Sequence, residues 1–199
     1  DPSLLWNEKI FLSRADTHFT AEETRFLPII LIYGSLIDMK EVTPPTAKIW
    51  VGHGKTPVAL VHTSWKEGEG CYVGIKGGTA STSHAHMDAG SFVFEALGVR
   101  WAQDLGMQEY YSLEKERLWD SNQDGQRWDI FRYNNFVHNT LTVNGKKHNV
   151  KGFAPITKTY TKDDKLGATV DLTSLFEGDL KKATREVVLI KENYLQITD

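Results

Sequence analysis

The residue types best suited to chemistry gather in one short stretch, residues 83–92, which reads Ser-His-Ala-His-Met-Asp-Ala-Gly-Ser-Phe. Two histidines stand two positions apart, and a carboxylate follows two positions later. Alternate side chains of an extended strand share a face, so the sequence predicts that His84, His86 and Asp88 project from one surface. Imidazole and carboxylate groups bind metal ions and transfer protons, and we therefore take this stretch as the candidate functional centre.

Two later residues add to this set. Asp104 follows an apolar run in Gln-Asp-Leu-Gly, and His138 lies in Phe-Val-His-Asn-Thr. A histidine of the first stretch together with Asp104 and His138 forms a plausible zinc set of mixed nitrogen and oxygen ligands. Neutral imidazoles held by neighbouring acceptors are what such a site requires. A purely structural role for the paired histidines stays open at this point.

Composition sets the broad class of the protein. The 199 residues carry a net charge of −3, and they suffice for one sizeable core or for one domain and part of another. This balance gives no support to a nucleic-acid partner, and no apolar run is long enough to predict a membrane partner. The single cysteine, Cys71, excludes an internal disulfide and is predicted to be a buried strand residue.

Residues 1–42 are predicted to be helical. Thr20-Ala21-Glu22-Glu23 has the form of a capping box, and apolar residues follow it at helical spacing. Pro28 lies within this run and predicts either the start of a helix or a kink. The Pro44-Pro45 pair then breaks the pattern and is the best boundary signal in the chain.

Short β-rich segments separated by glycine or proline follow this boundary. The predicted strands are residues 48–51, 58–62, 72–75, 91–101 with a bend at Leu97-Gly98, 140–143, 156–161, 168–171 and 186–190. Asn144-Gly145 predicts a hairpin turn. The chain stops in what reads as an unfinished strand, and both ends suggest a fragment. Many short strands at this spacing predict an antiparallel β-sandwich.

The stretch from 110 to 135 is polar and rich in aromatic residues. Trp119, Trp128, Phe131 and Tyr133 predict an ordered segment, which either stacks on carbohydrate or packs against its own sandwich. Residues 120–125 resemble half of a calcium-binding loop, but the twelfth position is Phe131 where a bidentate glutamate is needed. A simple Asp/Asn/Gly turn is therefore the favoured interpretation.

These motifs together resemble the heparinase II/III family of polysaccharide lyases. The matching pattern is His84-x-His86-Met87-Asp88-Ala89-Gly90-Ser91-Phe92, then Asp104-x-Gly106 with Tyr110, then Arg132 and His138-Asn139-Thr140. The order and approximate spacing of the blocks fit over residues 45–199. His-x-His followed by Asp-Ala-Gly is most similar to the heparinase II type.

The resemblance implies a mainly β protein, with an antiparallel β-sandwich preceded by the last helices of an α/α toroid. Residues 1–42 would be those helices, and residues 43–199 would be a sandwich truncated at its C-terminus. The family's active site lies in the cleft between toroid and sandwich. Its catalytic tyrosine and its carboxylate-neutralising Asn or His lie on the part of the toroid that this chain lacks. This chain alone is therefore expected to be inactive.

Site residues follow from the resemblance position by position. His86, Asp104 and His138 resemble the family's zinc ligands, and the implied Zn²⁺ has a structural role. His84 resembles the catalytic histidine on the sandwich, Tyr110 a tyrosine near the metal, and Arg132 a basic residue upstream of the last ligand. The spacing from His86 to Asp104 is one residue longer than the family pattern, which a β-bulge would absorb.

The implied function is cleavage of a uronic-acid-containing polysaccharide by β-elimination, as a carbon–oxygen lyase, with heparin or heparan sulfate-like chains expected first. The implied partner is an acidic polysaccharide, the implied location is periplasmic or secreted, and the resemblance is compatible with a homodimer. Two alternatives are a cupin-like metal enzyme and a non-catalytic carbohydrate-binding sandwich. The cupin pattern needs a glutamate a few residues after His-x-His, whereas the first one here is Glu95.

Overall fold

The computed structural model describes residues 5–6, 27–38, 40–66 and 68–199 and divides into two compact units, residues 1–47 and 48–199. In the first unit, helix α2 spans Leu27–Gly34. Pro28 lies in its first turn, where the missing N–H costs no intrahelical hydrogen bond. The predicted capping box at residues 20–23 lies outside the described residues. The toroid assignment and the boundary after residue 42 stay predictions.

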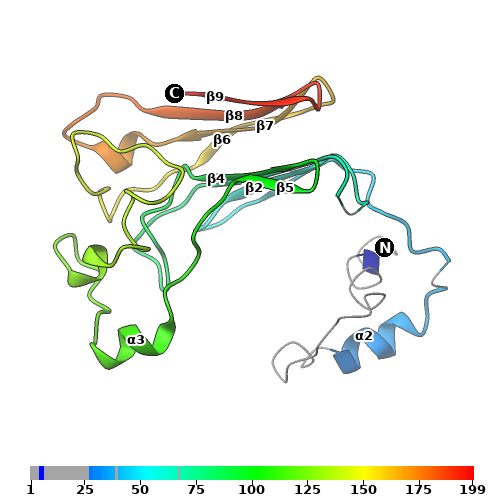
Figure 1. The fold of residues 1–199 in the computed structure, drawn as a ribbon, viewed down its shortest axis with the longest axis horizontal. Coiled ribbons are helices and arrows are strands. Elements are labelled where there is room, and N and C mark those ends of the chain that lie inside the picture. Colours follow the sequence, from blue (N-terminus) through cyan, green and yellow to red (C-terminus); the bar gives the residue numbers. More distant parts are fainter. Residues whose placement is uncertain (1–4, 7–26, 39, 67) are drawn as a thin grey trace. The chain divides into compact units, whose positions relative to one another are not determined.

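The second unit consists of two antiparallel sheets that lie face to face (Figure 1). The first sheet has the order β1-β2-β3-β4-β5, and the second has the order β6-β7-β8-β9. The strands are β1 Ile49–Gly52, β2 Val58–His62, β3 Cys71–Lys76, β4 Phe92–Ala96, β5 Val99–Ala102, β6 Ile156–Lys162, β7 Lys165–Asp171, β8 Thr184–Ile190 and β9 Tyr194–Thr198. The predicted mainly β, antiparallel sandwich is confirmed.

Alternating strand residues fill the space between the sheets. Ala59 and Val61 of β2 are fully buried, as are Ala168 and Val170 of β7. A slip of one residue in either pairing would turn these side chains outward, so the alternation fixes the register. Each fully buried Val contributes roughly 1.5–3 kcal/mol relative to an exposed one, which makes this core the rigid base of the unit.

The connections between strands agree with the sequence in one place and depart from it in another. Leu97 and Gly98 have φ values of 55° and 72° and join β4 to β5 at the predicted bend. The predicted strand 140–143 is absent: the Leu141 carbonyl accepts from His148 Nε2 and the Thr142 hydroxyl accepts from Asn135. Hydrogen bonds from the side chains of Asn135 and His148 take the place of a partner strand here. The turn at Asn144-Gly145 forms, but paired strands do not flank it.

A second, smaller core orders the segment from 110 to 135. Helix α3 (Tyr110–Lys115) and the 3₁₀ helices η3 (Gln126–Asp129) and η4 (Thr173–Phe176) are the short helices described in this unit. Trp128 and Tyr133 are buried with Leu113 and Met87, so these aromatic residues pack within the unit. Asp120 Oδ1 accepts from the Asn122 amide at 3.0 Å, which confirms the turn interpretation of residues 120–125.

His148 links this region to the main core and makes stability depend on pH. Its ring is buried, Nε2 donates to the Leu141 carbonyl at 2.8 Å, and burial lowers the pKa of His148 to about 4. The unfolded chain binds this proton near pH 6.5, so the contribution is complete above pH 6.5 and is lost as the pH falls toward 4. We expect His148 to account for about 3 kcal/mol of the fall in unfolding free energy over that range.

Urea denaturation at pH 7.5, 6 and 4.5 measures this effect, with His148→Gln as the matched variant. Glutamine keeps a donor for the Leu141 carbonyl but does not titrate. The variant should therefore lose less stability on acidification than the parent protein. An equal loss in both proteins would contradict the assignment to His148.

None of the helices in the described ranges has the length and apolar character of a membrane span.

Candidate active site

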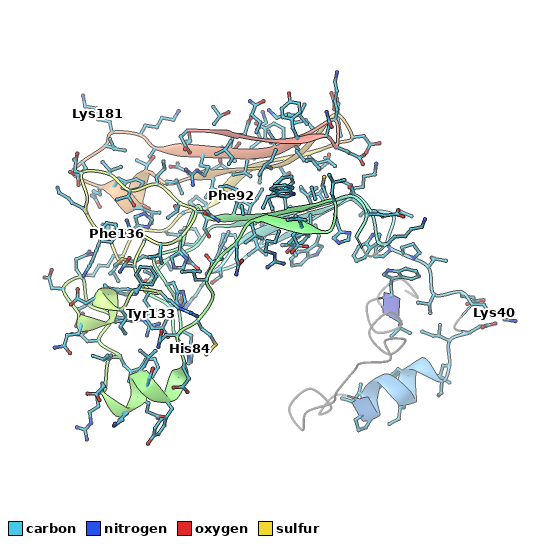
Figure 2. The ribbon with its side chains drawn as sticks, in the orientation of Figure 1. Lys40, His84, Phe92, Tyr133, Phe136 and Lys181 are labelled. Atoms are coloured by element: carbon cyan, nitrogen blue, oxygen red, sulfur yellow. The ribbon has the colours of Figure 1, made fainter. Side chains whose placement is uncertain are left out.

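The candidate residues gather at one edge of the first sheet. β3 ends, β4 begins and β5 ends at this edge because the three strands are antiparallel neighbours. The connection between β3 and β4 carries His84 and His86, and the segment after β5 carries Asp104. Figure 2 shows His84 and Tyr133 in the loop region beyond the end of β4 that Phe92 marks. The sheet therefore brings together segments that are far apart in the sequence.

The histidine stretch is a loop, and the predicted strand with three side chains on one face is wrong. Residues 81–90 form turns, bends and irregular segments, and His84 has a φ of 59°, in the left-handed region that non-glycine residues rarely adopt. Lys76 closes the base of the loop: its carbonyl accepts from the Gly90 amide at 2.7 Å, and its Nζ lies 2.5 Å from Asp88 Oδ2. Asp88 thus stabilises the loop through its ion pair with Lys76 and does not share the role of the two histidines.

His86, Asp104 and His138 are neighbours. His138 Nδ1 lies 2.7 Å from Asp104 Oδ2, and its side chain is fully buried. The rings of His86 and His138 have centroids 5.5 Å apart. The β4–β5 pairing shifts register at Phe94/Glu95, so a bulge lies between His86 and Asp104 where the sequence spacing asks for one. Each of the three proposed metal ligands therefore lies close to at least one of the other two.

The protonation state of His86 favours metal binding, whereas the hydrogen bond between Asp104 and His138 does not. Burial lowers the pKa of His86 to about 4, so its imidazole is neutral at pH 7 and keeps a free lone pair. The hydrogen bond with His138 holds the pKa of Asp104 below its ordinary value. Asp104 and His138 bond to each other as they stand, and in the described part of the chain no three His, Cys, Asp or Glu side chains are arranged to hold one ion.

His84 is exposed and stacks on Tyr110. The two ring centroids are 5.8 Å apart with an angle of 27° between the planes, and Tyr110 in turn lies 4.8 Å from Trp119. Glu109 caps the helix that begins with Tyr110, because its carboxylate accepts from the amides of Tyr111 and Ser112. The proposed catalytic imidazole therefore rests on a ring whose own position is fixed by a helix start.

Arg132 contacts backbone. Its Nη1 donates to the carbonyls of Leu105 and Met107 at 3.0 and 2.9 Å. Its own carbonyl lies 3.1 Å from His138 Nε2. Arg132 thus joins the segment after Asp104 to the segment before His138, which is a positioning role within the cluster.

Three residues that the sequence reasoning left without a role tie the site segments together. Asn139 Nδ2 donates to the carbonyls of Phe92 and Gln103, and the Thr140 hydroxyl donates to the Ala89 carbonyl at 2.6 Å. The guanidinium of Arg185 in β8 donates to the carbonyls of Gly90 and Asn139. The sequence could have indicated a role for Asn139 and Thr140, because both belong to the motif that follows His138.

Removing the Asn139 amide should loosen the site measurably. Asn139→Ala leaves two carbonyls without their donor, and we expect a loss of about 1–3 kcal/mol in unfolding free energy. Asn139→Asp should cost more, because a carboxylate has no donor and faces both carbonyls. Urea denaturation measures both, with the exposed Asn193→Ala as control. An Asn139→Asp protein at least as stable as Asn139→Ala would contradict the assigned bonds.

Comparison with known proteins places this geometry in a family. Residues 65–199 match the family model described as Heparinase II/III-like, C-terminal. This match covers all of the proposed catalytic and metal-binding positions. A comparison with curated proteins gave no match.

Solved structures with a similar fold include two lyases. The crystal structure of heparan sulfate lyase HepC from Pedobacter heparinus has a TM-score of 0.60 at 16% identity, covering 99% of this chain and 27% of that one. The heparinase III product of gene BT4657 has a TM-score of 0.55 at 18% identity, with coverages of 87% and 25%. At such identity the likeness shows the fold, and this chain spans about a quarter of the length of either structure.

Proposed function

The chain belongs to the heparinase II/III-like family through its C-terminal domain, and we propose from this that the full-length protein is a polysaccharide lyase. It would cleave uronic-acid-containing chains, with heparin or heparan sulfate-like polymers as the first candidates. The observation that carries the proposal is the exposed His84 stacked on Tyr110 beside the partly buried cluster of His86, Asp104 and His138. Polymers of this size also favour a periplasmic or secreted protein.

Elimination needs groups that move two protons. A base removes the proton beside the carboxylate, its electron pair forms the ring double bond, and the bond to the 4-oxygen breaks. The leaving oxygen then takes up a proton, and no water is consumed. His84 is accessible, and an imidazole can either accept or donate a proton. Tyr110 orients the imidazole by stacking, and Arg132 holds the Asp104 segment that supports it.

We also propose that Zn²⁺ binds to His86, Asp104 and His138. Two imidazoles and a carboxylate are a donor set that zinc accepts, and the neutral His86 is ready to bind. His138 Nδ1 must exchange its hydrogen bond to Asp104 for the ion, because a ligating nitrogen carries no proton. The bound ion would cross-link the histidine loop to the two later segments and thereby fix the loop that carries His84.

Zinc removal tests this assignment. Elemental analysis of purified full-length protein should find one zinc per chain, and the His138→Gln variant should lose it. Chelation should lower the melting temperature, because the ion binds the folded state alone. A protein without zinc that regains neither stability nor activity on zinc addition would contradict the site.

The lyase proposal is tested with a panel of substrates. Full-length protein is incubated with heparin, heparan sulfate, chondroitin and alginate, and absorbance is followed in the band of unsaturated uronates. We expect a rise with at least one polymer and none with a neutral glucan. Absence of a rise with every acidic polymer would contradict the proposal.

The two alternative functions have less support in the described residues. Glu95, the nearest glutamate after the histidine pair, forms an ion pair with Arg100 on the neighbouring strand and is thereby engaged outside the cluster. A cupin-like ligand set is therefore not assembled. A carbohydrate-binding sandwich needs exposed aromatic residues, which Phe131 and Tyr110 supply, but it does not need the partly buried histidine–carboxylate cluster.

A further inference from the structure

Arg127 is a buried cation that the proposed chemistry leaves unused. It lies in η3 and is 4% exposed. Among the described residues no carboxylate forms an ion pair with it, and the phenols of Tyr133 and Tyr110 are among the ionisable groups that act on it. Burying a charge without a counter-ion is costly, so this guanidinium must be compensated by its other contacts.

Aromatic faces surround Arg127. Its guanidinium carbon lies 4.3 Å from the ring centroid of Tyr133, 5.5 Å from that of Trp128 and 5.6 Å from that of Trp119. Cation–π attraction in a desolvated site offsets part of the cost of burial. The planar guanidinium suits this cage better than an ammonium group does, because it stacks on rings and keeps its N–H groups in the plane.

One N–H of this caged cation reaches the histidine loop. Arg127 Nη2 donates to the carbonyl of Ala85 at 2.8 Å, and Ala85 lies between His84 and His86. His84 has its left-handed φ of 59° directly before this bond. A non-glycine residue keeps a left-handed conformation only where surrounding contacts stabilise it. The hydrogen bond from Arg127 to the Ala85 carbonyl is one such contact.

A second route leads from Arg127 to the ring of His84. Trp119, which Arg127 contacts, packs against Tyr110 with the two ring planes tilted by 41°, and Tyr110 stacks on His84. The hydrogen bond to Ala85 and the series of ring contacts therefore both connect the guanidinium of Arg127 to His84. Arg127 thus contacts both the backbone next to His84 and the series of rings that ends at its imidazole.

We propose that Arg127 is the positioning residue for His84, acting through the Ala85 carbonyl and through the ring contacts of Trp119 and Tyr110. The proposal rests on the proposed lyase function for its catalytic meaning. It does not require Arg127 to touch substrate, in keeping with its burial. It also gives a reason for three aromatic residues of this segment, Trp119, Trp128 and Tyr133, which form the cage of one cation.

The position of the His84 ring is measured first by NMR of full-length protein with labelled histidine. The His84 resonance, assigned with His84→Gln, should be shifted upfield by the Tyr110 ring. Arg127→Met should lose most of this upfield shift, and Lys115→Met, which removes an exposed charge on α3, should keep it. An unchanged His84 resonance in Arg127→Met would overturn the proposal.

Activity is measured second, on the polymer that the parent protein cleaves. Arg127→Met should lower kcat by about 100-fold with little change in KM, because a misplaced catalytic group loses rate rather than binding. Its melting temperature should be kept or raised, since methionine suits an apolar cage. A stable Arg127→Met protein with parental kcat would overturn the proposal, as would a loss of activity that only follows loss of folded protein.

If Arg127→Met does not fold, the Arg127→Lys variant tests whether Arg127 positions His84. Lysine keeps the charge but lacks the planar fork, so it should restore kcat only in part and leave the His84 resonance between the two extremes. Parental values of both in Arg127→Lys would overturn the role of the stacked guanidinium. If the parent protein cleaves no polymer, the lyase function fails, and the NMR shift still tests whether Arg127 positions His84.

Discussion

Replacing His84 by alanine is expected to lower kcat of the full-length protein by about 10²–10⁴-fold, the usual contribution of one acid–base group. His84 is exposed and makes its described contact through its ring on Tyr110, so its removal should leave the fold intact. Binding of the polymer should change little, because the surrounding loop is held by Asp88 and Lys76. Steady-state kinetics together with a binding measurement such as calorimetry separates these two effects.

The matched control is Ser83→Ala, which alters the preceding exposed residue and should keep parental kcat. A His84→Ala protein with parental turnover would remove His84 from the mechanism. The same pair of variants separates a lyase from a carbohydrate-binding module. A binding module has no turnover to lose, whereas a lyase without His84 should still bind its polymer.

Replacing Trp128 by alanine is expected to cost about 3–5 kcal/mol, the largest effect on stability that we expect from one substitution. Its side chain is fully buried, and Nε1 donates to the Asn122 carbonyl at 2.8 Å. Its ring is also one wall of the cage around Arg127. The variant should therefore lose both stability and the order of the His84 loop, measured by urea denaturation and by the His84 NMR resonance.

Trp101→Ala is the matched control, because Trp101 lies 64% exposed on β5. It should cost less than about 1 kcal/mol, in the range of surface substitutions. Equal destabilisation by the two tryptophan variants would contradict the existence of a separate core beneath the site. It would also remove the physical basis for a caged Arg127.

Most of the fold could be predicted from the sequence because strand alternation is a local signal. β2 buries every second residue, and the predicted limits of β2 and β3 agree with the structure to within one residue. The strand at 140–143 was predicted wrongly for a physical reason. Its β-rich composition is real, but the Leu141 carbonyl bonds to the side chain of His148 and not to a neighbouring strand, and strand periodicity does not predict such a bond.

The site was predicted in part. The resemblance picked out His84, His86, Asp104 and His138, and the structure brings the last three together. The prediction that His84, His86 and Asp88 share one strand face was wrong, because Asp88 forms an ion pair with Lys76 and the stretch is a loop. Arg127 could not be found from spacing, since its importance comes from a bond to Ala85, 42 positions away in the chain.

The aromatic residues of the 110–135 segment show the same limit. Sequence composition left carbohydrate stacking and internal packing equally open. Trp128 and Tyr133 pack internally, whereas Phe131 is 66% exposed. Spacing does not distinguish these cases, because the segment has no regular period and its burial depends on Met87 and Val150 from other loops.

The fate of water in the cleavage reaction tests the proposed elimination most directly. Full-length protein is allowed to degrade its polymer in water enriched in heavy oxygen, and the products are analysed by mass spectrometry. We expect a terminal unsaturated uronate and no heavy oxygen from the bond cleavage, because elimination consumes no water. Products that carry one heavy oxygen for each cleaved bond and no unsaturated uronate would show hydrolysis and contradict the proposed function.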